Sequence, residues 1–188
     1  VYGNDGVDTG GTADNDRGAL SVSSVDVNEA SNYAVFTVVG TTGSAVTLSL
    51  VNASGDGGVD AAQGKADLRS GATPALPTLQ YLDGTTWTDY SASSPPTLPA
   101  SGLKVRVLIS AEQDTPFDGA ETFMLQANDG AVTASGTATI YDDGTGSKFT
   151  FDATTGQPSS TSGPGASFDD DRPLTVNSIR VNEGSEYA

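Results

Sequence analysis

The sequence has no cysteine and no histidine, and it has 8 basic residues against 24 acidic ones. Without cysteine there is no disulfide and no thiolate nucleophile, and without histidine there is no Ser-His-Asp triad and no imidazole metal ligand. The formal net charge of −16 argues against a basic surface that grips nucleic acid. No run of about 18 apolar residues occurs, so we expect no membrane insertion. Any bound metal would therefore take oxygen ligands.

What the chain does contain suits a folded domain with an acidic surface. Of its 188 residues, 36% are hydrophobic, which is enough to fill a modest core. The acidic residues are 19 Asp and only 5 Glu. Short carboxylates in turns and loops are well suited to rigid cation sites.

An internal repeat links the two ends of the chain. Residues 14–34, DNDRGALSVSSVDVNEASNYA, return as residues 169–188, DDDRPLTVNSIRVNEGSEYA, with one residue deleted near Pro173. Such self-similarity is typical of tandem modules joined by linkers, each module contacting its neighbours along the chain.

The repeat predicts the domain organisation. We expect residues 1–16 to be the end of a preceding module with its linker, and residues 17–143 to be one complete module. Residues 144–172 are a predicted linker rich in Ser, Gly, Pro and Asp, and residues 173–188 are predicted to begin the next module.

Apolar and polar residues alternate through the predicted complete module, with the period of β-strands. The alternating stretches are residues 20–27, 35–38, 46–51, 79–81, 87–90, 103–109, 122–126 and 137–141. No stretch keeps a helical period over three turns, although residues 60–69 have room for one turn. Many short strands bounded by Gly, Pro, Asp and Ser predict an all-β fold, a β-sandwich.

Acidic residues gather where these predicted strands begin or end. In an antiparallel sandwich, strand ends far apart in sequence meet at one tip. Two carboxylates about 4 Å apart repel by about 4 kcal/mol at an effective dielectric constant near 20, and a bound cation reverses the sign. Ca²⁺ accepts six to eight oxygen ligands in loose geometry, so we expect Ca²⁺ as the cofactor.

The chain resembles the Calx-beta module over most of residues 20–144. The resemblance rests on VNEA at 27–30, GVD at 58–60, DTPFDGAETF at 114–123 and IYDDG at 140–144. It implies a Greek-key, immunoglobulin-like β-sandwich. Similar modules, joined by Asp-rich linkers, recur in the extender regions of very large bacterial surface adhesins of the RTX type, which are exported by type I secretion.

The resemblance also implies a set of calcium ligands. By match to the family's motif these are Glu29, Asp60, Asp114, Asp118, Glu121, Asp142 and Asp143. Asp118 stands where the family usually has Glu, and Gln113 occupies a position that is often acidic, so one ion can be lost or bound less tightly.

The linker acids form a second candidate set. Asp14 and Asp16, and again the run from Asp169 to Asp171, stand just before a predicted strand. They are either ligands of a second calcium ion between modules or charged residues of a solvated hinge.

The resemblance implies a non-enzymatic function. We expect a calcium-stabilised extender module of a secreted bacterial adhesin, located at the cell surface and stiffened by Ca²⁺ to project a distal binding region in cell adhesion or biofilm formation. Its partners would be neighbouring repeats of the same chain, and a cell-surface glycan or protein target would be bound elsewhere in the adhesin.

Two alternatives stay open at this point. The module could itself bind a glycan or protein, through Trp87 with Tyr81 and Tyr90 or through an insertion at residues 60–75. A hydrolase using an acid pair is the weaker alternative, because with 24 acidic residues such pairs arise by chance and no cleft-forming pattern is visible.

One basic residue lies in an apolar strand pattern. Lys104 alternates outward with Arg106, which is typical of a protected edge strand. A cross-link from a buried Lys104 to an acid and an Asn is the other interpretation.

Overall fold

The structure is a computed structural model, and it describes residues 18–52, 68, 79–109, 117, 119–151, 158–161, 170, 172–176 and 178–187. Within these ranges the chain forms strands, turns and extended segments, and no helix. A helix able to cross a bilayer is accordingly not found in the described ranges. The strands in chain order are β1 (Ser21–Val22), β2 (Val25–Asn28), β3 (Tyr33–Val39), β4 (Thr47–Val51), β5 (Leu79–Asp83), β6 (Thr86–Asp89), β7 (Leu103–Leu108), β8 (Glu121–Asn128), β9 (Thr133–Tyr141), β10 (Lys148–Phe151) and β11 (Pro158–Thr161).

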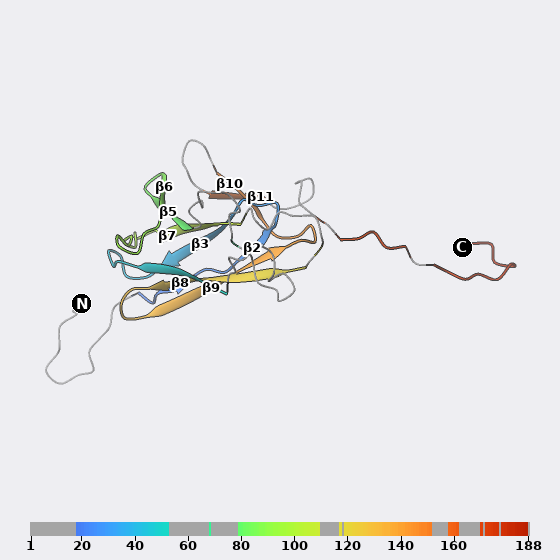
Figure 1. The fold of residues 1–188 in the computed structure, drawn as a ribbon, viewed down its shortest axis with the longest axis horizontal. Helices are drawn as coiled ribbons and strands as arrows, with labels where there is room; N and C mark the ends of the chain where they lie inside the picture. Colours follow the sequence, from blue (N-terminus) through green and yellow to red (C-terminus); the bar gives the residue numbers. More distant parts are fainter. Residues whose placement is uncertain are drawn as a thin grey trace, which may run out of the picture.

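Two larger sheets pack against each other (Figure 1). One has the strand order β1-β3-β7-β5-β6, and the other has the order β2-β9-β8-β4. All neighbours are antiparallel except β2, which runs parallel to β9. A third, two-stranded sheet pairs β10 with β11. The described part of the chain is therefore an all-β, sandwich-like fold, which confirms the predicted fold class at that level.

The core lies between the two larger sheets. Phe36 of β3 and Phe123 of β8 meet edge to face, with ring centroids 5.9 Å apart, a favoured geometry for aromatic pairs. The inward residues of each strand alternate with outward ones, so each of the two sheets has one face buried in the core. Other buried core residues are Val27, Val38, Val46, Leu98, Leu103, Val105, Val107, Ile109, Leu125, Ala127, Ala138 and Ile140.

The predicted alternating stretches all fall on strands, but several boundaries differ. The pattern at residues 137–141 marks only the second half of β9, which starts at Thr133 because it pairs with β8 along the whole hairpin. A hairpin at Asp83 and Gly84 joins β5 to β6, and Gly84 has a φ of +63° that favours glycine.

The first predicted strand is in fact two strands that belong to different sheets. β1 pairs with β3 and β2 pairs with β9. The crossing lies at two serines. Ser23 bonds to β3 through both its N–H and its hydroxyl, and the Ser24 hydroxyl accepts from the N–H of Thr137 on β9 at 3.2 Å.

The edge-strand interpretation of Lys104 is wrong. β7 lies in the middle of its sheet, between β3 and β5. Lys104 and Arg106 do face outward, on the outer surface of the sheet. There the Lys104 ammonium donates a hydrogen bond to the Thr37 hydroxyl at 2.8 Å.

Part of the stretch predicted to be a linker carries its own strands, β10 and β11. Beyond it, residues 172–176 and 178–187 extend away from the sandwich (Figure 1). The possible helical turn at 60–69 falls outside the described residues except for Leu68, which is buried.

Candidate functional site

Four of the predicted metal ligands lie at one end of the sandwich. Glu29 follows β2, Glu121 begins β8, and Asp142 and Asp143 follow β9. The N–H of Glu29 donates to the carbonyl of Tyr141 at 3.0 Å, and Glu121 is paired in register with the penultimate residue of β9. The backbone therefore gathers three separate segments around the end of β9. We call these four residues the acidic end.

Three carboxylates of the acidic end are buried. The exposed fractions are 3% for Glu29, 5% for Glu121 and 2% for Asp142. The Oε1 atom of Glu29 is buried and accepts no hydrogen bond from the described residues, although Glu29 makes other interactions. Burying an ionised carboxylate is unfavourable unless hydrogen bonds or a cation compensate it.

The turn after β2 is held by two buried polar residues that the sequence analysis missed. Asn28 donates from Nδ2 to the Tyr141 carbonyl at 3.2 Å and accepts from the N–H of Ala30 at 3.0 Å. The Ser31 hydroxyl donates to the Tyr33 carbonyl at 2.7 Å and accepts from the N–H of Phe149 at 3.0 Å. These bonds fix the direction in which the chain leaves β2. Their signal in the sequence is the return of both residues in the second copy of the repeat.

The loop after β9 wraps around the end of β2. Asp143 accepts from both the N–H and the hydroxyl of Thr145. Ser147 then lies beside β2, donating to the Asp26 carbonyl at 3.0 Å and accepting from the N–H of Asn28 at 3.1 Å. The loop that follows Asp142 therefore runs along the end of β2.

One of the predicted linker acids contacts the acidic end. Asp170 forms a backbone bridge with Asp143. Arg172 donates to both carboxylate oxygens of Asp170 at 2.7 Å. The hydrogen bond from Arg172 lowers the pKa of Asp170, and the same bond raises the pKa of Arg172. The chain is thus attached to the acidic end just before it leaves the sandwich.

The remaining predicted ligands cannot be placed. The candidates that lie outside the described residues are Asp14, Asp16, Asp60, Asp114, Asp118, Asp169 and Asp171. Among the residues that are described, no three acidic side chains are grouped in a way that could hold a metal ion. The four described candidates lie at the same end of the sandwich, and both their role as ligands and the calcium site stay predictions.

The outer face of the five-stranded sheet, β1-β3-β7-β5-β6, holds a second polar cluster. The Arg106 guanidinium lies between the rings of Tyr33 and Trp87, 4.2 Å and 4.5 Å from their centroids. It also donates to Gln80 at 2.7 Å, and Gln80 donates to Asp89 at 2.6 Å. Partial burial lowers the pKa of Arg106, and Tyr33 and Asp89 oppose that shift. One face of the Trp87 ring is therefore covered by Arg106.

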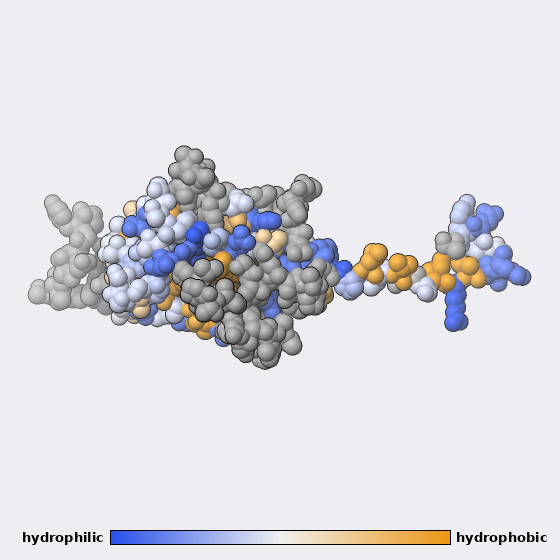
Figure 2. All heavy atoms as spheres, turned by 45° about the horizontal axis from the view of Figure 1, so that its top comes forward, coloured by the Kyte–Doolittle hydropathy of each residue, from blue (hydrophilic) through white to orange (hydrophobic). Residues whose placement is uncertain are grey.

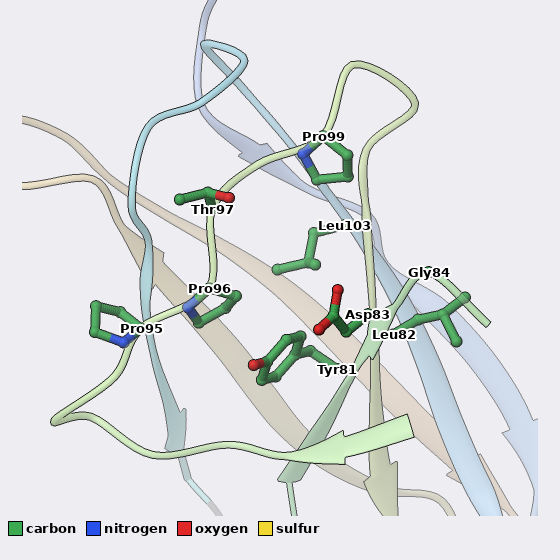
Figure 3. Close-up of a pocket in the computed structure, with 9 residues that line it drawn as sticks. All are labelled: Tyr81, Leu82, Asp83, Gly84, Pro95, Pro96, Thr97, Pro99 and Leu103. Carbon is green, nitrogen blue, oxygen red and sulfur yellow. The ribbon is translucent and has the colours of Figure 1, made fainter. Parts of the chain in front are cut away.

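A shallow pocket of about 350 Å³ lies beside the β5–β6 hairpin (Figure 3). Tyr81 and Leu103 line it together with the loop that carries Pro95, Pro96 and Pro99. The described residues that line it include one acidic side chain, from the tip of the hairpin, and no basic one. These residues by themselves supply no acid–base pair for catalysis.

Comparison with known proteins finds no matching family model, no similar curated protein and no similar solved structure. The functional argument therefore depends on the chemistry of the acidic end.

Proposed function

We propose that this chain is a calcium-stabilised structural module, a non-enzymatic extender repeat of a secreted bacterial surface adhesin. In finer detail, the proposal is a Greek-key sandwich of the Calx-beta kind, strung in tandem with neighbouring repeats in the extracellular space. The module would hold a distal binding region away from the cell surface in adhesion or biofilm formation.

The observation that carries the proposal is the burial of three carboxylates at the end of β9. Glu29, Glu121 and Asp142 come from three different segments, and each is no more than 5% exposed. A divalent cation would compensate their mutual repulsion and their loss of hydration. An oxygen-only donor set in a chain without cysteine or histidine fits Ca²⁺ better than Zn²⁺.

Several further side chains would complete the coordination. Asp143 directly follows the buried Asp142 after the end of β9. The proposed additional ligands are Asp60, Asp114 and Asp118 at the same site, and Asp14, Asp16, Asp169 and Asp171 at a second site between modules. The ion supplies positive charge only, so its role is to stabilise the fold and the junction.

The proposed mechanism is calcium-gated folding and stiffness. Without the ion, the clustered negative charge repels and the end of the sandwich is destabilised. When calcium binds the folded state alone, its binding free energy adds to the folding free energy. A chain of this kind stays loose where calcium is scarce, during type I secretion, and becomes stiff outside the cell.

Calorimetric titration with Ca²⁺ tests the proposal on a pair of variants. Glu121→Gln removes one charge from the acidic end, and we expect the dissociation constant for Ca²⁺ to rise by about tenfold or more because affinity follows ligand charge. Asp129→Asn is the matched control. Asp129 caps the β8–β9 hairpin at the other end of the strands by accepting from the N–H groups of Ala131 and Val132.

A melting experiment gives the second measurement. We expect a chelator to lower the melting temperature of the wild-type chain, and to shorten a chain of several modules in solution scattering. Unchanged melting with the chelator, or equal calcium affinity in the two variants, would contradict the proposal.

A further inference from the structure

The segment of residues 172–187 exposes apolar side chains to solvent along its length. The exposed fractions are 95% for Leu174, 85% for Val176, 62% for Ile179, 51% for Val181 and 84% for Tyr187. Figure 2 shows hydrophobic atoms, coloured orange, along the segment that projects from the body of the molecule. An apolar stretch of this kind is typical of a surface that another element covers.

The sequence counterparts of these residues are packed in the sandwich. In the register of the repeat, Leu174 corresponds to Leu20 and Val181 corresponds to Val27. Leu20 is 9% exposed and Val27 is fully buried. The same pattern of side chains thus appears once inside a sandwich, as β1 and β2, and once in a segment that is not packed in a sandwich.

The segment already holds the local conformation of its counterpart. At residues 28–33 and again at residues 182–187, the side-chain oxygen of the asparagine accepts from the N–H two residues on, at 3.0 and 2.9 Å. In both copies the asparagine carbonyl accepts from the serine N–H, at 2.8 and 2.9 Å, and the serine hydroxyl donates to the tyrosine carbonyl at 2.7 Å. The turn that follows β2 is therefore formed in the segment without any sheet beside it.

The segment cannot occupy this position in its own sandwich. Its first residues follow Asp170, which is bridged to Asp143 beyond the C-terminal end of β9. β2 runs parallel to β9, so a segment that takes the place of β2 must begin at the other end of β9, near Gly136. Leu174 would have to reach beyond that end of β9. Seven residues of strand from Gly136 to Asp143 span about 23 Å, whereas four residues from Asp170 to Leu174 reach at most about 14 Å. The place is also filled by the chain's own β1 and β2.

We infer that residues 174–187 are a donor unit that completes a second copy of this sandwich, taking the place that β1 and β2 occupy in the first. Leu174 to Val176 pair with the counterpart of β3, and Ile179 to Asn182 pair in parallel with the counterpart of β9. This is strand addition at two sheet edges, with backbone hydrogen bonds supplying affinity and the buried apolar side chains fixing the register. The inference does not depend on calcium.

Cysteine pairing between two full-length chains tests the register. Asp26 lies opposite Thr139 on the outer face of β2 and β9, and Arg180 is the repeat counterpart of Asp26. We combine a donor chain carrying Arg180→Cys with an acceptor chain carrying Thr139→Cys. Since the chain has no cysteine of its own, a mixed disulfide reports only this pair. Adjacent strands lie about 4.8 Å apart, which a disulfide can bridge.

The two chains are unfolded together and refolded at about 1 mM, where a segment from another chain competes with a tethered one. The buffer contains calcium, and calcium affinity is measured separately, so either proposal can fail alone. We expect about tenfold more mixed disulfide than with an acceptor carrying Thr133→Cys, which is exposed at the far end of β9. Adding Val181→Asp to the donor chain should abolish the excess of mixed disulfide. Val181 is exposed in the donor, so this substitution leaves the donor's own sandwich intact.

Equal amounts of mixed disulfide with the two acceptors would overturn the inference. So would an absence of mixed disulfide from chains whose Trp87 fluorescence shows that they have refolded, or an excess that survives Val181→Asp.

Discussion

Gly146 shows how closely the loop after β9 fits the end of β2. Its φ is +87°, and a Cβ atom there would lie 2.6 Å from the backbone nitrogen of Asn28. Only glycine allows both the left-handed backbone and this approach. The approach is what lets Ser147 hydrogen-bond to β2 from the side opposite β9. The end of β2, and Glu29 after it, is consequently held on both sides.

We expect Gly146→Ala to destabilise the fold by roughly 2–4 kcal/mol, because it adds a steric clash with backbone to the strain of a positive φ. Gly43→Ala is the matched control, since Gly43 has a φ of +84° and nothing within 4 Å of the added Cβ. It should lose about 1 kcal/mol from backbone strain alone. Urea denaturation measures both values, and equal losses would show that the close approach is not tight.

Among the elements, β7 illustrates how one strand serves two surfaces. Leu103, Val105 and Val107 face the core and are at most 2% exposed, whereas Lys104 and Arg106 face outward. Because β7 lies between β3 and β5, Arg106 has an aromatic ring on each side, Tyr33 from β3 and Trp87 from β6. The cation–π stack ties the outer faces of neighbouring strands together.

Arg106→Lys keeps the charge of this stack but removes its planar group. We expect a loss of about 1 kcal/mol in unfolding free energy, together with a shift in the fluorescence of Trp87, the single tryptophan of the chain. Lys104→Arg, on the same strand and face, should change neither. An unchanged Trp87 emission in Arg106→Lys would contradict the stacking.

At the scale of the whole molecule, charge is strongly unbalanced. The net charge is −16, and the ion pair between Asp170 and Arg172 lies outside the sandwich body. Repulsion among surface acids therefore opposes compaction of the sandwich, and salt screens it over a Debye length of about 10 Å at 0.1 M.

In the presence of a chelator, we expect the melting temperature to rise by about 3 °C or more between low salt and about 0.5 M NaCl, which corresponds to roughly 1 kcal/mol for a chain of this size. With calcium present the gain should be smaller, because the ion already neutralises the acidic end. Differential scanning calorimetry in the four conditions measures this. A melting temperature that falls with NaCl in chelator would contradict the account.

The sequence could predict the all-β class and the positions of the strands, because a half-buried strand imposes a period of two on its own residues. It also placed acids at strand ends, and four of these acids lie at the same end of the sandwich. It did not reveal that residues 20–27 change sheets, although the step of three between Val22 and Val25 interrupts the alternation at the crossing.

Local features can thus be inferred from the residues of each segment: the alternation, the turns, and the Asn-Ser turn that forms both within the sandwich and outside it. The edges that those segments occupy are set by the folded arrangement of the sheets. It placed β7 at the centre of a sheet, brought Glu29 beside the end of β9, and left the second copy of β1 and β2 exposed. The reason is physical: local patterns depend on neighbours along the chain, whereas pairing depends on which backbone edges are within reach in space.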